Sequence, residues 1–312
     1  MNKSYLIAAL LTALAAVALY NQHTEPSAYS FDQFKADYQK SYTRTGEEEY
    51  RKAIFLRNLI KIAEHNANPA NTHQLGVTQF ADLTDAEFQA IYLTLTVPKK
   101  SVEGVNKIKS TSPIQGDIDW KASGKVSQVK NQGACGSCWA FSATGAIESA
   151  YLLKGSSPLV SEQQLVDCSR SYGNQGCNGG WMDSAFQYVR DKGLTGQDAY
   201  PYVARDQACK IDSGAWKISG FVDVPGCDSL LNALSGRPIS VAVDASNWSL
   251  YKGGILSNCG VNVNHGVLLI GVTDANWRIK NSWGTGWGEN GFIRLARGNT
   301  CAVCSYPSYP TL

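Results

Sequence analysis

The chain has 312 residues, a formal net charge of +2 at neutral pH and a hydrophobic content of 44%. This near-neutral balance excludes a general affinity for nucleic acid or for acidic surfaces. The length fits one large domain or two modest ones, each with a buried core.

The N-terminus has the pattern of a secretory signal peptide, which we expect to span residues 1–19. Lys3 gives a positive start, and Tyr5–Leu19 is apolar and uncharged. This run is short for a membrane span, and Ala16–Ala18 follows the small-x-small rule of cleavage sites. An uncleaved membrane anchor is the alternative. The chain is therefore expected to enter the secretory pathway, where disulfides form and persist.

Residues 29–66 are charged and are predicted to be helical. Six of them recur at spacings of three or four, which places them on one face of a single helix. These six are Glu47, Arg51, Phe55, Asn58, Ile62 and Asn66. A further short helix is expected from about Asp85. Residues 97–116 are rich in Lys, Ser, Gly and Pro, which is typical of a linker open to proteolysis.

From Asp119 onward Trp, Cys and Gly become frequent, and helices are expected before strands. The predicted helices are Cys138–Lys154, Ser161–Val166 and Asp183–Lys192. The predicted strands are Trp216–Val224, Ile239–Val243, Gly266–Val272, Trp277–Asn281 and Gly291–Leu295. Helices followed by antiparallel strands indicate an α+β protein in two lobes, and ligand sites often lie between such lobes.

All nine cysteines lie at or beyond residue 135. A secreted chain with an odd number keeps at least one thiol unpaired unless it bonds to another chain. Cys135 and Cys138 stand three residues apart in the stretch QGACGSCWAF, at the start of a predicted amphipathic helix. Such a pair can hold a redox dithiol, a metal ligand, a disulfide partner or a nucleophile.

Three of these roles explain the pair poorly. A redox dithiol opens a helix within a βαβ unit, and here no parallel crossover follows. A zinc site needs a second ligand pair at a set spacing, and none of the four histidines lies within twenty residues of either cysteine. A structural disulfide accounts for Cys135 but does not explain why position 138 is a cysteine.

A nucleophile explains Cys138. The free N–H groups and the dipole of a helix N-terminus favour a thiolate, and a nearby imidazolium lowers the pKa of the thiol further. A leaving amine then needs a proton donor, hence a histidine. His265 is the only histidine after residue 73, although taken alone it fits an ordinary core histidine better. An ideal ladder pairs Asn281 with Leu268, so a contact between Asn281 and His265 needs a bend in the strands.

Together these residues resemble the papain family of cysteine proteases, in particular its cathepsin L-like group. The family signature C-G-[SA]-C-[WY], with His and Asn about 130–150 residues downstream, matches Cys135–Trp139, His265 and Asn281. The resemblance extends to CNGG at 177–180, NHG at 264–266 and NSWGTGWGE at 281–289. The helical face described above matches the ERFNIN propeptide pattern at all six positions. The resemblance covers nearly the whole chain after the signal peptide.

The resemblance implies a papain-like two-lobed α+β fold, with a helical left lobe and an antiparallel, β-barrel-like right lobe. A helical inhibitory propeptide at 20–112 would precede a mature peptidase domain at 113–312. The implied activity is that of a cysteine endopeptidase, which works through a thiolate–imidazolium pair and an acyl-enzyme. The zymogen would be activated at acidic pH, when carboxylates such as Asp82 and Glu47 are protonated.

The resemblance also implies roles for individual residues. Cys138 is the nucleophile, His265 the acid and base, and Asn281 the residue that orients His265. The side chain of Gln132 and the backbone N–H of Cys138 form the oxyanion hole. The implied substrate-binding residues are Gly136, Gly180, Trp181, Met182, Ala242, Val263, Asn264, Tyr306 and Trp283.

Two of these residues, and one in the propeptide, depart from the family pattern. Tyr306 at the base of the specificity pocket should make the pocket shallow. Its hydroxyl should then need a hydrogen-bond partner. Because the pocket carries no carboxylate, we expect a bulky apolar residue at the second position of the substrate and no preference for arginine. Asn264 stands where many relatives have Asp, and Thr78 stands where the propeptide motif GxNxFxD has Asn.

The disulfides that the resemblance implies are Cys135–Cys177, Cys168–Cys209 and Cys259–Cys301. Cys227 and Cys304 lie beyond the family's usual three pairs, and each alone fits a free buried thiol. A fourth disulfide between them would resolve the odd count, because Cys138 would then be the one free thiol.

The implied partners are protein and peptide substrates, the chain's own propeptide as an intramolecular inhibitor, and cystatin-like inhibitors. No nucleic acid, no cofactor or metal, and no membrane after signal removal is expected, and family members are usually monomers. The implied location is a lysosome, an acidic vacuole or the outside of the cell. The alternative function is a catalytically silent papain-like binding protein. Such relatives lose Cys, His or Gln, all of which this chain retains.

Overall fold

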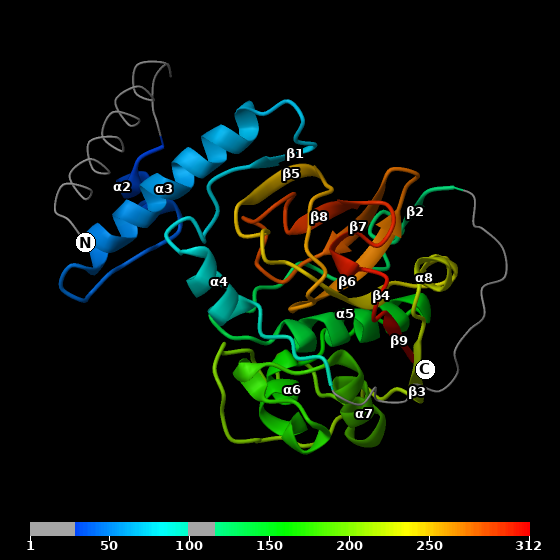
Figure 1. Cartoon of the computed structure of the whole chain (residues 1–312). Helices are drawn as coiled ribbons and strands as arrows, with labels where there is room; N and C mark the ends of the chain where they lie inside the picture. Colours follow the sequence, from blue (N-terminus) through cyan, green and yellow to red (C-terminus); the bar gives the residue numbers. More distant parts are fainter. Residues whose placement is uncertain (1–28, 99–115) are drawn as a thin grey trace, which may run out of the picture. The chain divides into compact units, whose positions relative to one another are not determined.

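The computed structural model describes residues 29–98 and 116–312 (Figure 1). The expected signal peptide lies outside these residues, as does nearly all of the expected linker. Among the described residues, no helix has both the length and the apolar character of a membrane span. The chain divides after Leu56 into two compact units, which we describe separately.

The first unit holds α2 (Phe31–Asp37) and the start of α3 (Glu47–Ala67). The Ser30 side chain caps α2 by accepting a hydrogen bond from the Gln33 N–H, at 3.0 Å. The rings of Phe31 and Phe34 are buried against Phe55 of α3, with centroid distances of 5.5 and 5.0 Å. The Phe55 position of the ERFNIN pattern therefore forms the small core of this unit.

The helix expected over 29–66 is interrupted, and this prediction was wrong for residues 38–46. The chain leaves α2 at Tyr38, and Gln39 adopts φ 52°. Gly46, directly before α3, has φ 74°. Left-handed residues of this kind end a right-handed helix, and charge and apolar spacing alone do not reveal them.

In the second unit, the rest of α3 organises the chain that follows it. Asn66 clamps the backbone of Leu75, donating to its carbonyl at 2.8 Å and accepting from its N–H at 2.9 Å. Asn58 donates to the carbonyls of Ala81 and Leu83, at 2.8 and 3.0 Å. The two asparagines of the ERFNIN pattern thus bind the segment that leads into α4 (Asp85–Tyr92).

The sheet of the described residues has nine strands and is mostly antiparallel. Eight strands run in the spatial order β1 (His73–Leu75), β5 (Tyr251–Leu256), β8 (Phe292–Ala296), β7 (Asn276–Lys280), β6 (His265–Val272), β4 (Ile239–Val243), β9 (Ser308–Thr311) and β3 (Gly220–Asp223), and β2 (Ile118–Asp119) pairs with β6. Only the β5–β8 pair among them is parallel. The five predicted strands are present with small shifts in their ends. β5 and β9 were not predicted because glycine and proline interrupt their patterns.

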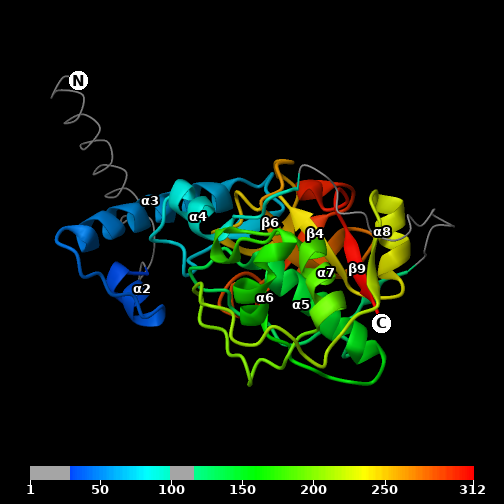
Figure 2. The ribbon, with the colours of Figure 1, turned by 90° about the horizontal axis from the view of Figure 1, so that it is seen from below.

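Four helices follow the propeptide elements in sequence. They are α5 (Cys138–Leu153), α6 (Glu162–Cys168), α7 (Met182–Lys192) and α8 (Cys227–Leu234), with single 3-10 turns at Ser169–Tyr172, Gly176–Asn178 and Thr300–Ala302. α5 lies between the sheet and the pair α6 and α7 (Figures 1 and 2). Its residues 138–149 are all buried, so α5 is a central helix rather than the amphipathic one expected.

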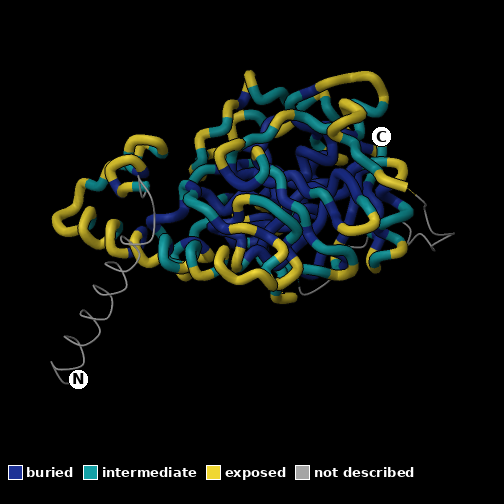
Figure 3. The backbone as a smooth tube through the Cα atoms, turned by 90° about the horizontal axis from the view of Figure 1, so that it is seen from above, coloured by how far each residue is buried: buried dark blue, intermediate teal, exposed yellow. Residues whose placement is uncertain are grey.

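The second unit has two hydrophobic cores. One fills the sheet side and includes Trp248, Trp277 and Trp287. The other surrounds α5 and includes Trp139 and Phe186. Buried residues are concentrated in the interior, and exposed turns lie around them (Figure 3). The expected α+β architecture is confirmed. It has a helical lobe and a β lobe, and an N-terminal propeptide precedes both in the sequence.

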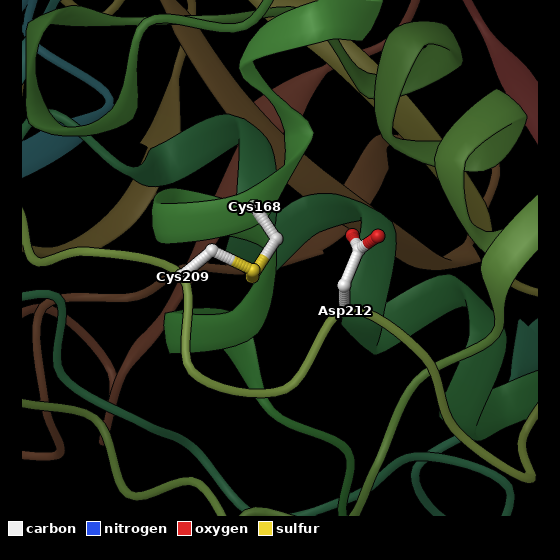
Figure 4. Close-up of side chains that lie close together, drawn as sticks. All are labelled: Cys168, Cys209 and Asp212. Atoms are coloured by element: carbon white, nitrogen blue, oxygen red, sulfur yellow. A yellow bond between two sulfur atoms is a disulfide. The ribbon is translucent and has the colours of Figure 1, made fainter.

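All four expected disulfides are present, namely Cys135–Cys177, Cys168–Cys209, Cys227–Cys304 and Cys259–Cys301. The ninth cysteine, Cys138, is free and buried. Asp212 lies beside the Cys168–Cys209 bridge (Figure 4). These two sulfur atoms are bonded to each other, and Lys192 binds the Asp212 carboxylate at 2.8 Å. This cluster therefore has no thiolate to offer a metal ion.

The Cys227–Cys304 bridge gives a testable prediction about stability. It closes a loop with a sequence separation of 77 and ties α8 to the segment before β9. Replacing both cysteines by serine should lower the free energy of unfolding by about 2–4 kcal/mol. Denaturation of the double variant in a Cys138→Ala background, which avoids self-digestion, measures this loss. A thiol count on the unreduced, unfolded wild-type protein should find one free thiol, and a count of three would contradict the bridge.

Candidate active site

Cys138 is the first residue of α5, and its side chain is fully buried. The start of β6 touches this helix end at Gly266. A Cβ placed on Gly266 would lie 3.3 Å from the Cα of Trp139 and 3.4 Å from the carbonyl oxygen of Cys138. This close approach places the thiol next to the residue that follows His265, so the structure brings the two predicted catalytic residues together.

His265 begins β6 and is fixed by Asn281. Its Nε2 lies 2.8 Å from the Asn281 Oδ1, which also accepts the Ser282 N–H at 2.8 Å. Because this oxygen is an acceptor, we assign the ring proton to Nε2. Nδ1 is then an unprotonated acceptor. It is buried and has no hydrogen-bond partner among the described residues, so it is available to take a proton.

The bend that this contact needs is a β-bulge in β6. Val272 faces Trp277, but beyond the irregularity Leu268 faces Lys280 instead of Asn281. The extra residue, Ile270, moves the end of β7 one position closer to the start of β6. The pairing of Asn281 with Leu268 in an ideal ladder is therefore absent. The bulge allows Asn281 to reach the imidazole.

Tryptophans enclose the imidazole. The ring of Trp283 stacks on His265 at a centroid distance of 4.7 Å, and Trp248 meets it edge-on at 6.1 Å. Both tryptophans are buried. Water is thereby kept away from the His265–Asn281 hydrogen bond, which strengthens its hold on the ring.

The environment of the two catalytic groups favours their neutral forms. Burial raises the pKa of the Cys138 thiol to about 11, although the backbone N–H groups of Gly266 and Trp139 act in the opposite direction. Burial lowers the pKa of His265 to about 4, and the bond to Asn281 opposes this. The sequence predicted a lowered thiol pKa. The opposite shift arises because both groups are shielded from water in this proenzyme.

Gln132 is held with its amide nitrogen toward the nucleophile loop. Its Oε1 accepts from the Ser282 hydroxyl at 2.7 Å and from the Trp283 indole at 3.1 Å. Its Nε2 donates one proton to the carbonyl of Cys135 at 3.0 Å. The second proton of this amide group remains for a substrate oxygen. Sequence reasoning missed the role of Ser282, for which the only signal is its place after Asn281.

The segment Thr94–Thr96, which lies within the expected propeptide, covers the site. The Thr94 hydroxyl donates to the Gly136 carbonyl at 2.9 Å, the Leu95 N–H to the Asn264 carbonyl at 3.1 Å, and the Thr96 N–H to the Gly180 carbonyl at 3.4 Å. These three carbonyls belong to residues expected to bind substrate. The segment therefore occupies the backbone groups that an extended substrate strand would use.

Several of the expected specificity residues share a hydrophobic core with Leu95. Leu95 is buried in the same cluster as Trp181, Met182 and Ala242, and Val263 packs against this cluster. Tyr306 meets Trp181 edge-on at 5.5 Å. Tyr306 is 44% exposed, so water can serve as the partner that the sequence suggested for its hydroxyl.

Asn264 holds the turn before the catalytic strand. Its Oδ1 accepts from the Ala245 N–H at 2.9 Å, and its Nδ2 donates to the Ser246 hydroxyl at 2.8 Å. Thr78, the other departure from the family pattern, donates to the Ser249 carbonyl at 2.7 Å. Both substituted side chains thus retain a defined hydrogen-bonding role.

Comparison with known proteins agrees with this geometry. Residues 114–311 match the model of the papain family cysteine proteases, and residues 31–88 match that of the cathepsin propeptide inhibitor domain. The chain is 44% identical to cathepsin L 2 of Paramecium tetraurelia, over 96% of this chain and 99% of that protein. It is 39% identical to cathepsin S of Bos taurus, over 99% and 100% of the two chains.

A solved structure of similar fold is that of digestive procathepsin L 3 from the larval midgut of Tenebrio molitor. It is 40% identical in sequence, has a TM-score of 0.84 and covers 90% of this chain and 97% of that one. The chain belongs to the papain family and is a cysteine protease made as a zymogen, with its own inhibitory propeptide.

Proposed function

We propose that this protein is a cathepsin L-like endopeptidase with Cys138 as nucleophile, His265 as acid and base, and Asn281 as the residue that orients the imidazole. The observation that carries the proposal is the His265–Asn281 bond of 2.8 Å. It supports a ring proton on Nε2 and an unprotonated Nδ1 near the start of α5. The alternative function, a catalytically silent binding protein, does not explain this arrangement.

In the proposed reaction, Nδ1 of His265 takes the proton of Cys138 and the thiolate attacks the scissile carbonyl. The Gln132 side chain and the Cys138 N–H stabilise the oxyanion that forms. His265 then gives its proton to the leaving amine. Water, deprotonated by the same imidazole, hydrolyses the thioester and releases the second product.

Propeptide removal has an electrostatic consequence in this proposal. In the proenzyme, burial favours a neutral thiol and a neutral imidazole. Loss of the segment Thr94–Thr96 lets water reach both groups. Hydration lowers the free energy of the charged forms, and the free N–H groups at the start of α5 then favour the thiolate. Activation thus exposes the site and changes its protonation state.

Three substitutions test the catalytic assignments. Cys138→Ala should abolish cleavage of a peptide substrate and labelling by a thiol-directed epoxide. Gln132→Ala should lower kcat about 10²–10³-fold, because it removes one donor to the oxyanion. Asn281→Ala should lower kcat and leave KM nearly unchanged, because the residue does not touch substrate. Steady-state kinetics on the processed enzyme measures all three, and an active Cys138→Ala protein would refute the nucleophile.

We further propose that the enzyme prefers a bulky apolar residue at the second position of the substrate. Support comes from the apolar cluster of Trp181, Met182 and Ala242, in which the propeptide places Leu95. A peptide library should show leucine and phenylalanine preferred at that position. A preference for arginine there would contradict the proposal, because binding an arginine side chain needs a carboxylate and the expected pocket residues do not supply one.

We also propose that acidic pH releases the propeptide, and one histidine pair supports this beside the carboxylates named above. His73 of β1 pairs with Gly254 of β5 and stacks on Tyr251, at a centroid distance of 6.3 Å. His65 of α3 lies 4.4 Å away, ring to ring, and Gly254 also contacts Glu289, which is paired with Arg294. Burial, and then the charge of His65, lower the pKa of His73 to about 4.

The sign of this effect favours release in acid. A pKa below the ordinary 6.5 means that the docked strand binds fewer protons than the free one. Docking is therefore fully supported above pH 6.5 and weakens as pH falls from 6.5 toward 4. Within this window, each tenfold rise in proton concentration weakens docking by up to tenfold, so the docking equilibrium should change by about two orders of magnitude in all.

His73→Phe tests this contribution, because phenylalanine keeps the ring but cannot be protonated. The pH at which half of this variant has processed itself should be lower than for the wild type. Gel electrophoresis of samples incubated at pH 4–7 measures the processed fraction. The mature enzyme released is identical in both cases, so its own pH profile cancels. His65→Gln should shift the midpoint in the same direction by less. An unchanged midpoint in His73→Phe would exclude the histidine.

We propose domain boundaries of 1–19 for the signal peptide, 20–112 for the propeptide and 113–312 for the mature enzyme. The start of the family match at residue 114 supports the last of these. The four disulfides support passage through the secretory pathway to a lysosome, an acidic vacuole or the cell exterior. By resemblance to its family, the enzyme would act as a monomer and be inhibited by cystatin-like proteins.

A further inference from the structure

Both donors of the proposed oxyanion hole belong to one short loop. Gln132 begins this loop and Cys138 ends it, so the distance between the two donors depends on how the loop is held. The Gln132 side chain is fixed by Ser282 and Trp283, and its backbone N–H donates to the Ser282 carbonyl at 2.8 Å. These bonds secure only the first end of the loop.

Tyr202 binds both ends of this loop from a distant part of the chain. Its hydroxyl donates to the Gln132 carbonyl at 2.7 Å and lies 2.6 Å from the Ser137 hydroxyl. A phenol has one proton, which goes to the carbonyl, so the Ser137 hydroxyl donates to the phenol oxygen. One side chain thus connects the residue that carries the first donor to the residue preceding the second.

The segment that carries Tyr202 is itself clamped by α6. Gln163 accepts from the Val203 N–H at 2.9 Å and donates to the Arg205 carbonyl at 2.8 Å. The Tyr202 ring meets Phe141 of α5 edge-on at 4.9 Å. Backbone and ring are therefore held independently of the hydroxyl, so removal of the hydroxyl alone should leave the rest of the segment in place.

The hydroxyl is a permanent donor. Burial raises the pKa of Tyr202 far above its ordinary value of 10, so the phenol stays protonated at every pH at which the enzyme works. The Ser137 hydroxyl is committed to Tyr202 and makes no capping bond at the start of α5. Ionisation of the phenol therefore does not break the bridge from Gln132 through Tyr202 to Ser137.

We propose that Tyr202 is a positioning residue that sets the alignment of the two oxyanion donors, Gln132 Nε2 and the Cys138 N–H. This inference rests on the proposed function. Electrostatic stabilisation of an oxyanion depends on donors fixed at hydrogen-bond distance from the place where charge develops. Small misplacements of such groups have large effects on rate. In this proposal Tyr202 acts through the loop, by its hydrogen bonds to Gln132 and Ser137.

The test compares Tyr202→Phe with Tyr200→Phe in the processed enzyme. Tyr200 lies in the same segment, and its hydroxyl binds Asp167 at 2.8 Å and the Lys210 N–H at 3.1 Å, away from the oxyanion loop. Both variants lose the hydrogen bonds of one phenol, so both should unfold at a lower temperature. Tyr200→Phe thereby controls for a purely structural loss.

Three readouts separate the roles. Tyr202→Phe should lower kcat for a peptide amide about tenfold with KM within about twofold, because a misaligned donor costs less than a deleted one. Affinity for a peptide aldehyde, whose thiol adduct places its oxygen in the hole, should fall by about the same factor. Alkylation of Cys138 by iodoacetamide, which forms no oxyanion, should keep its rate within about twofold. Tyr200→Phe should leave all three readouts within that range.

Ser137→Ala, which removes only one arm of the bridge, should give a smaller loss of kcat with the same pattern. The inference is overturned if Tyr202→Phe leaves kcat and the affinity for the aldehyde unchanged. It is also overturned if the alkylation rate of Tyr202→Phe falls as much as its kcat, or if Tyr200→Phe shows the same losses as Tyr202→Phe. Failure of the proposed function itself would look different, because wild-type protein would then be inactive or Cys138→Ala would be active.

Discussion

The contact between the first turn of α5 and the first residues of β6 is the constraint on which this enzyme depends. It joins the two hydrophobic cores of the second unit at the point where Gly266 meets Cys138 and Trp139. A side chain at Gly266 would press on both the helix backbone and the Met182 sulfur, 3.1 Å from where its Cβ would lie. The separation of the proposed nucleophile and the proposed base is thus set by backbone contact, which varies less than contact between flexible side chains.

The same propeptide segment that covers the site also alters its chemistry. Thr94–Thr96 uses three carbonyls of the substrate-binding surface, and the rings of Phe80 and Phe88 each meet Trp283 edge-on at 5.3 Å. Trp283 in turn covers His265. In the proposed mechanism this chain blocks access to the site and helps to withhold water from the ionising groups, so its removal by proteolysis would change both.

The sequence singled out Cys138 as a candidate nucleophile at a helix start and His265 as a candidate partner, and the resemblance to the papain family supplied their expected roles and those of Asn281 and Gln132. The sequence could not predict their geometry. The bulge at Ile270 lets Asn281 reach His265, and the alternation of residues along a strand does not reveal such an extra residue. The thiol pKa moved against expectation because it depends on what covers the site. Tyr202 lies in an irregular segment, where no spacing pattern links it to Gln132.

The start of α5 shows what this arrangement costs. Ser137 occupies the N-cap position but its hydroxyl is engaged by Tyr202, so the helix begins without a side-chain cap. A good cap typically stabilises a helix by about 1 kcal/mol. Here the uncapped end leaves its partial positive charge directed at the cysteine sulfur. Thermostabilisation by the usual routes, such as an aspartate at this position, would neutralise that charge, so conformational stability and thiolate reactivity compete for the same residue.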